Sequence, residues 1–224
     1  MLILKFILAF CSLAYELILA QGLSAFLDNT VLRYSTTIGL YMFAMGLGTL
    51  ISGRVDLRRP ALVLWQAEIL LVVFGAGSVI SLFFFSGLNV SAVLIVVWAY
   101  VLVALIGFLT GFELPLMLHM SSREGRPSRG RIMAIDYAGA LAATIVFVFY
   151  FYSFAGLVRS AMMVALLNAL AAAVVAVRWR EDFGFCRDAA ILASLSLVGG
   201  ALAVFLFSGP LEAQLITHYL TRGN

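Results

Sequence analysis

The chain has 224 residues, of which 64% are hydrophobic and only 11% are charged. A soluble domain carries about 25% charged residues, so this composition excludes a water-soluble globular enzyme and a disordered chain. The net charge of +3 is compatible with nucleic-acid binding, but the sequence has no base-reading motif and no basic stripe with interleaved aromatic residues. We therefore expect a membrane protein without a nucleic-acid partner.

Long apolar runs separated by short polar breaks organise the sequence, and a membrane-spanning helix takes about 20 apolar residues. Two breaks contain residues typical of helix ends, with Pro60 at the first helical position of one run and Gly156 between two others. We predict an all-α, polytopic membrane helical bundle of about seven transmembrane helices over residues 1–208. The expected spans are 2–26, 34–52, 61–85, 92–118, 132–155, 160–177 and 189–208.

The basic residues predict the orientation of this bundle. Eleven of the 14 Lys and Arg residues fall on one side of the expected spans, and positive residues are enriched on the cytoplasmic side of membrane proteins. Since Lys5 lies on that side, we place the N-terminus in the cytoplasm. After Pro210, apolar residues from Leu211 to Leu220 share one helical face, so we expect residues 209–224 to form a short amphipathic tail or linker.

Small residues inside the runs indicate close helix packing. Gly107 and Gly111 form a G-x-x-x-G pattern, and Ala138, Gly139 and Ala140 stand together in a later run. Small side chains let helix backbones approach each other in a membrane. We expect these residues to pack helices within one chain rather than to form a dimer interface.

Four acidic residues lie inside the apolar runs, namely Glu16, Glu68, Glu113 and Asp136. An acid costs about 2.5–3.5 kcal/mol at the centre of a membrane helix, so each should face protein or water and find a partner. Three of them lie in the cytoplasmic half of their expected spans, and Glu16 lies deeper. This arrangement predicts an acidic cavity that opens to the cytoplasm and suits a cation or protons.

Ion pairing within the protein is the alternative role for these acids. Glu113 and Asp136 lie close in depth to the arginines at 54 and 123–131, whereas Glu16 has no basic residue at its depth. Tyrosines at 15 and 137 adjoin two of the acids and offer hydrogen bonds or aromatic faces to a cation, although tyrosines are also common at the lipid interface. The predicted ligand-binding residues are Glu16, Glu68, Glu113, Asp136, Tyr15 and Tyr137.

Other kinds of site find little support in the sequence. His119 and His218 have no companion at metal-ligand spacing, so we expect no metal site. No nucleotide-binding G-x-G-x-x-G, P-loop or G-x-S-x-G motif occurs, and we expect no cofactor and no catalytic residue. Pro115 lies two residues after Glu113 and frees backbone carbonyls there, which predicts a kink beside the acidic cavity.

Several of these segments also carry a family resemblance. They are YEL (15–17), YMFAMGLG (41–48), GFELPL (111–116), DYAGAL (136–141) and GLVR (156–159). In this order, over about residues 10–175, they resemble the membrane region of bacterial spermidine-synthase-like proteins. The resemblance implies a multi-pass protein of the bacterial inner membrane, similar to half of a major-facilitator transporter. In that family the region precedes a domain that transfers an aminopropyl group from decarboxylated S-adenosylmethionine to putrescine.

The acids and the resemblance together predict a function. We expect an integral inner-membrane protein that binds or transports a small organic cation, a polyamine, through the acidic intramembrane cavity. The alternative is a non-catalytic membrane anchor or subunit for an aminopropyltransferase or another partner. An intramembrane enzyme is disfavoured because no nucleophile–base pair is recognisable, and the glycine-rich site and catalytic acids of the family's transferase domain are not found in this chain. The expected partners are the lipid bilayer, a polyamine ligand and a synthase or other membrane partner.

Overall fold

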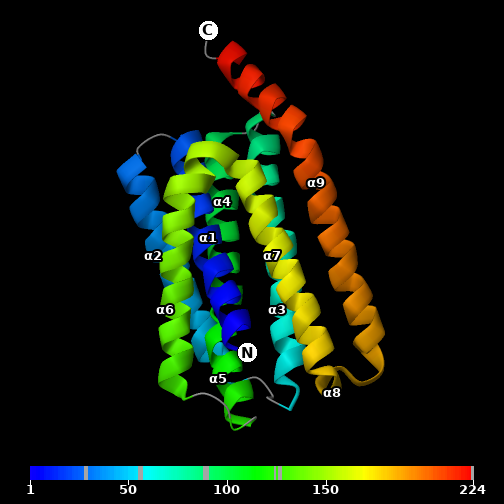
Figure 1. Ribbon diagram of the computed structural model, residues 1–224. Helices are drawn as coiled ribbons and strands as arrows, with labels where there is room; N and C mark the ends of the chain where they lie inside the picture. The colour runs from blue at the N-terminus through cyan, green and yellow to red at the C-terminus, as the bar shows by residue number, and fades with distance from the viewer. Residues whose placement is uncertain (28–29, 55–57, 88–90, 124, 126–127, 223–224) are drawn as a thin grey trace.

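The computed structural model of the protein describes residues 1–222 apart from 28–29, 55–57, 88–90, 124 and 126–127. Within this part of the chain all regular secondary structure is helical (Figure 1). The helices are α1 (Leu2–Leu27), α2 (Thr30–Ser52), α3 (Pro60–Gly87), α4 (Ala92–Thr110), α5 (Glu113–Arg123), α6 (Arg129–Val146), η1 (Phe147–Ala155), α7 (Leu157–Arg178), α8 (Arg180–Phe183), η2 (Gly184–Cys186) and α9 (Arg187–Arg222).

Seven helical segments of the described chain are long and apolar enough to cross a membrane, judged by length and composition. They lie where the sequence predicts its seven spans. The fourth segment includes both α4 and α5, and the fifth combines α6 with η1. The prediction of an all-α fold is therefore confirmed for the described residues, whereas the placement of these helices in a membrane stays a prediction.

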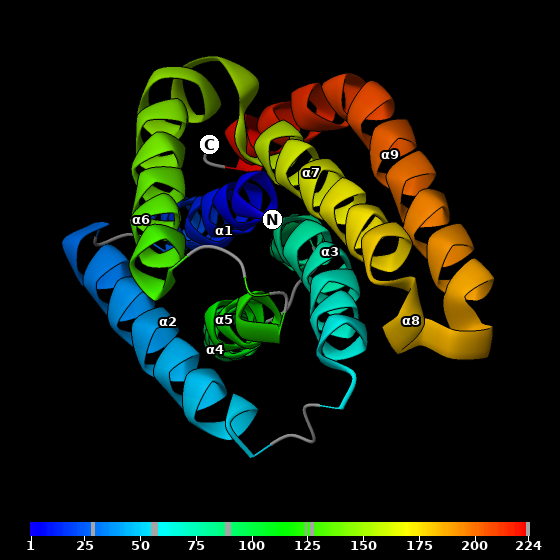
Figure 2. The same cartoon turned by 60° about the horizontal axis from the view of Figure 1, so that its bottom comes forward.

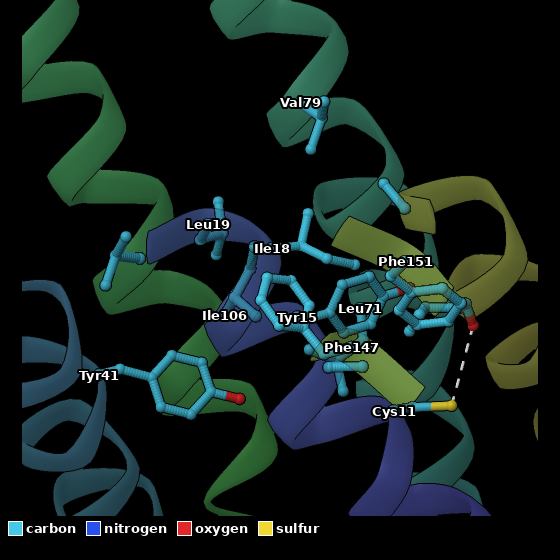
Figure 3. Close-up of a cluster of buried hydrophobic side chains, with 14 of the residues drawn as sticks. Cys11, Tyr15, Ile18, Leu19, Tyr41, Leu71, Val79, Ile106, Phe147 and Phe151 are labelled. Carbon is cyan, nitrogen blue, oxygen red and sulfur yellow. Dashed lines mark hydrogen bonds between the residues drawn. The ribbon is translucent and has the colours of Figure 1, made fainter. Parts of the chain in front are cut away.

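Helix α1 lies at the centre of the bundle. It contacts α2, α3, α4, α6 and α7, which surround it in Figure 2, while α9 packs at the edge, mainly against α7. An apolar core forms around α1, where Tyr15, Ile18 and Leu71 are buried together with Phe147 and Phe151 of η1 (Figure 3). Some side chains of α1 therefore lie in this apolar core, whereas others face surfaces that the neighbouring helices do not cover.

The fourth span is broken between α4 and α5. Pro115 lies in the first turn of α5 and has no backbone N–H, so the Gly111 carbonyl four residues earlier lacks its usual helical donor. The Thr49 hydroxyl of α2 donates a hydrogen bond to this carbonyl at 2.9 Å. The helix is thus interrupted at residues 111–112, close to Pro115, and Glu113 is the first residue of α5. The bend predicted beside Pro115 stays a prediction.

Glycines allow α2 and α4 to approach closely. A Cβ atom added to Gly107 would lie 2.6 Å from the Tyr41 carbonyl oxygen, and one added to Gly111 or Gly48 would also meet the backbone of the facing helix. Similarly, a Cβ atom on Gly139 of α6 would meet the backbone of α1. The small residues therefore pack helices within one chain, as predicted.

A tight turn at Gly156 precedes the last two long helices, α7 and α9. Gly156 has a φ of 75°, a conformation that favours glycine, and it connects η1 to α7. Helix α9 extends from Arg187 to Arg222 without a break, so the backbone of residues 209–222 continues the last helix. The role of this segment as an amphipathic tail or linker stays a prediction. The start of α1 and the end of α9 lie at opposite ends of the bundle (Figure 1).

Candidate functional site

A cleft with a volume of about 730 Å³ opens between α1, α2, α5 and α6. Most of its walls are apolar, and its ionisable side chains are Lys5, Glu16, Glu113, Asp136 and the tyrosines at 41 and 137. Three carboxyl groups and one ammonium group therefore share the cleft, which carries an excess of negative charge when all four are ionised.

One face of α1 forms a wall of this acidic cleft. Lys5, Ala9, Ser12, Leu13 and Glu16 line it, and residues spaced by three and four share one side of an α-helix. At about 1.5 Å per residue, Lys5 and Glu16 lie about 16 Å apart along the helix axis. Their side chains therefore mark the two ends of the α1 wall.

The Lys5 ammonium group is buried at one end of the cleft. Its Nζ atom lies 2.7 Å from Asp136 Oδ1 and 3.8 Å from Glu113 Oε2. The Lys5 side chain is 2% exposed, whereas that of Asp136 is 25% exposed. Charge-assisted hydrogen bonds of this kind are stronger than neutral ones, so this ion pair joins the first turn of α1 to α5 and α6.

The partner of Glu113 and Asp136 differs from the one suggested by the sequence. The arginines at 54 and 123–131 were the candidates, but the structure pairs both acids with Lys5. Because α1 is central and packs against α6, the Lys5 side chain reaches both acids from inside the bundle.

Glu16 is the acid in the cleft that remains available to a ligand. It is 7% exposed, and among the described residues its carboxyl group has no hydrogen-bond or ion-pair partner. The Tyr41 hydroxyl of α2 lies on the same cleft and donates a hydrogen bond to the Ser12 carbonyl at 2.8 Å. Tyr41 is thereby held against the α1 wall, one turn from Glu16.

Two of the six predicted ligand residues lie outside the cleft. Glu68 of α3 is fully buried beside Asn168 of α7 and does not line the cleft. The Tyr15 ring lies in the apolar core against Gly75 (Figure 3), because successive residues of an α-helix point about 100° apart. The expected cavity therefore does not include Glu68 or Tyr15, while the other four predicted residues line it.

Three further residues line the cleft that are not among the predicted ligand residues, namely Lys5, Ser12 and Tyr41. Lys5 was counted only among the basic residues of the cytoplasmic side. Lys5 lies three helical turns before Glu16, and this spacing indicates that the two residues share one face of the helix. Ser12 lies on the same face. Tyr41 carries no such signal, because its position depends on how α2 crosses α1.

Comparisons with known proteins identify relatives over nearly the whole chain. The chain matches no family model and no solved structure. It is 31% identical, over 97% of its length, to polyamine aminopropyltransferases 1 and 2 of Ralstonia nicotianae, of which it covers 41% and 42%. It is 30% identical, again over 97% of its length, to polyamine aminopropyltransferase 1 of Streptomyces coelicolor, of which it covers 41%. The chain thus spans about two fifths of the length of these curated relatives.

These similarities correct the predicted family assignment and function. The resemblance was expected over about residues 10–175, to a membrane region similar to half of a facilitator transporter. It instead extends over 97% of the chain, to proteins named polyamine aminopropyltransferase. Because that name denotes an enzyme, the transport interpretation is wrong, and so is the alternative of a non-catalytic membrane anchor or subunit.

Proposed function

We propose that the protein acts in aminopropyl transfer to a polyamine, as the membrane-embedded helical part of a polyamine aminopropyltransferase, and that the acidic cleft binds the polyamine. The observation that carries the proposal is the similarity over 97% of the chain to proteins with that name. The composition of the cleft supports the proposal independently of these similarities. A polyamine consists of ammonium groups joined by alkyl chains, and the cleft combines carboxyl groups with apolar walls.

The cleft already holds one alkylammonium group, which is that of Lys5. Its contacts with Asp136 and Glu113 illustrate how carboxylates bind such a group at this end. At the deeper end, the Glu16 carboxyl group binds an ammonium group of the substrate, and the Tyr41 ring offers it an aromatic face. The methylene groups of the substrate lie against the apolar walls between these ends.

Aminopropyl transfer sets a second requirement on the bound polyamine. The attacking nitrogen must be an uncharged amine, because an ammonium nitrogen has no lone pair. It forms a bond to the aminopropyl carbon as that carbon leaves its donor, and the nitrogen then loses a proton. In our proposal the cleft holds one ammonium group of the acceptor, so that another nitrogen of the same molecule is presented to the donor.

We further propose that the seven spans lie in the bacterial inner membrane with the N-terminus in the cytoplasm. Large apolar side chains on the outside of the bundle support this location, for example Leu141 (63% exposed), Phe149 (71%) and Val174 (52%). Large apolar side chains that stay exposed are unfavourable in water. The excess of basic residues on one side of the spans supports the orientation.

Neutralising Glu16 is expected to weaken polyamine binding. Glu16→Gln keeps the shape of the side chain but removes its charge, and a hydrogen bond to a charged group contributes about 1.5–3 kcal/mol. Spermidine affinity, measured by calorimetry on the purified protein, is therefore expected to fall about tenfold or more. The matched control is Glu181→Gln, because Glu181 is an exposed acid outside the cleft. Unchanged spermidine binding by the Glu16 variant would contradict the assignment of the cleft.

Aminopropyl transfer is the second measurement on the same variants. If Glu16 binds the acceptor equally in the ground state and the transition state, Glu16→Gln raises KM for the polyamine and leaves kcat nearly unchanged. Transfer is assayed with the intact protein. A complete lack of transfer by that protein would contradict the assignment as an enzyme, whatever the affinity for spermidine.

A further inference from the structure

A second cavity, of about 1000 Å³, lies where α7, α8 and α9 meet, and it reaches the ends of α3 and α5. We call it the α7–α9 groove. It shares no lining residue with the acidic cleft. Figure 2 shows α9 beside α7 at the edge of the bundle and α8 at the end of both helices. The groove therefore lies at the edge of the bundle, apart from the acidic cleft.

The floor of the groove is apolar. Leu170, Val174 and Val177 lie on one face of α7, and Leu195 faces them from α9. These side chains are 44%, 52%, 60% and 51% exposed. The strip runs along α7 for about 10 Å, at about 1.5 Å per residue. An apolar strip parallel to the helix axis at the edge of a membrane bundle fits an acyl chain.

One end of the groove is basic. Arg123 of α5, Arg178 of α7 and Arg180 of α8 line it. The Arg178 guanidinium group lies 5.5 Å from the ring centroid of Trp179. Tryptophan is enriched where membrane helices meet the headgroup layer, so this end of the groove has the composition of a headgroup site.

Two acids also line the basic end, but they leave it with a net positive charge. Glu181 and Asp182 oppose the three arginines. The Asp182 carboxylate accepts a hydrogen bond from the Ala61 backbone N–H at 3.0 Å and so caps the start of α3. Arginine binds phosphate oxygens with paired hydrogen bonds, and this charge balance favours an anionic headgroup over a cationic one.

We propose that the α7–α9 groove binds an anionic phospholipid, with its phosphate at Arg123 and Arg180 and an acyl chain along the strip from Leu170 to Val177. The basic end lies on the side of the spans where most basic residues gather, and basic pockets between membrane helices on that side bind anionic headgroups. This site goes beyond the proposed polyamine chemistry, and its ligand comes from the bilayer.

The proposed site predicts that the protein retains an anionic lipid in preference to phosphatidylcholine, and this preference can be measured. The full chain is exchanged into an equimolar mixture of phosphatidylglycerol and phosphatidylcholine with identical acyl chains, and bound lipids are counted by native mass spectrometry. Each arginine near anionic lipid contributes about a fivefold preference. Arg123→Ala with Arg180→Ala is therefore expected to lower the preference for phosphatidylglycerol about 25-fold. Val174→Trp fills the strip and is expected to lower the retention of phosphatidylglycerol while both arginines stay in place.

Controls separate this site from a general surface effect. Arg54→Ala with Arg59→Ala removes two exposed charges that do not line the groove, and it should leave the preference unchanged. Circular dichroism establishes that each variant is folded. Equal retention of the two lipids by the unmodified chain would overturn the proposal, as would the same preference in the Arg123/Arg180 variant. Displacement of the lipid by millimolar inorganic phosphate would also overturn it, because the site would then bind a free anion.

Discussion

Replacing Lys5 by methionine is expected to lower the free energy of unfolding by about 3–5 kcal/mol. The substitution nearly keeps the length of the side chain but removes the ammonium group that lies between Asp136 and Glu113. Removing one member of a buried ion pair leaves the opposite charge buried without compensation. Glu113 is 2% exposed and cannot turn to water without moving α5. The loss is measured on the full chain by titrating denaturing detergent into mixed micelles.

Two comparisons isolate the ion pair. Arg187→Met removes a cation of similar size whose partner, Asp188, is 82% exposed, and it should cost less than about 1 kcal/mol. Adding Asp136→Asn to Lys5→Met removes the acid at the shorter distance, so the double variant should be more stable than Lys5→Met alone. A loss below about 1 kcal/mol in the Lys5 variant would contradict a stabilising role for this pair.

Most of the fold was predictable because it depends on local patterns. The apolar runs are long enough to predict seven long helices, and Pro115 indicates the break between α4 and α5 from the chemistry of a single residue. The sequence predicts that helices pack closely at the glycines at 107 and 111, but it does not predict which residues of α2 and α4 meet. It does not say that Tyr41 is the residue packed against Gly107.

The candidate site was predictable only in part, because it depends on which helix lies at the centre. The criterion of an acidic residue inside an apolar run identifies Glu16, Glu113 and Asp136 from the sequence alone. The same criterion included Glu68, which α3 directs toward Asn168 and away from the cleft. The role of Lys5 was missed because a lysine near an N-terminus is typical of a membrane surface, whereas α1 is central here and buries it.

Gly107→Ala is expected to destabilise the protein by about 2 kcal/mol. Alanine is the better helix former by about 1 kcal/mol, so a change that met open space would be favourable. At this position the added methyl group would lie 2.6 Å from the Tyr41 carbonyl oxygen and 3.1 Å from the Tyr41 Cα atom. These are backbone atoms, so the contact is relieved only if α2 moves away from α4.

That movement has a consequence for the cleft, because Tyr41 lies on its surface and holds its hydroxyl against Ser12. We therefore expect Gly107→Ala to weaken spermidine binding as well as stability, although residue 107 does not line the cleft. Gly77→Ala in α3 is the matched control, since no atom lies within 4 Å of its added Cβ atom. It should leave both properties unchanged or raise stability by up to about 1 kcal/mol. Equal effects of the two substitutions, measured by detergent unfolding and calorimetry, would contradict a close contact between α2 and α4.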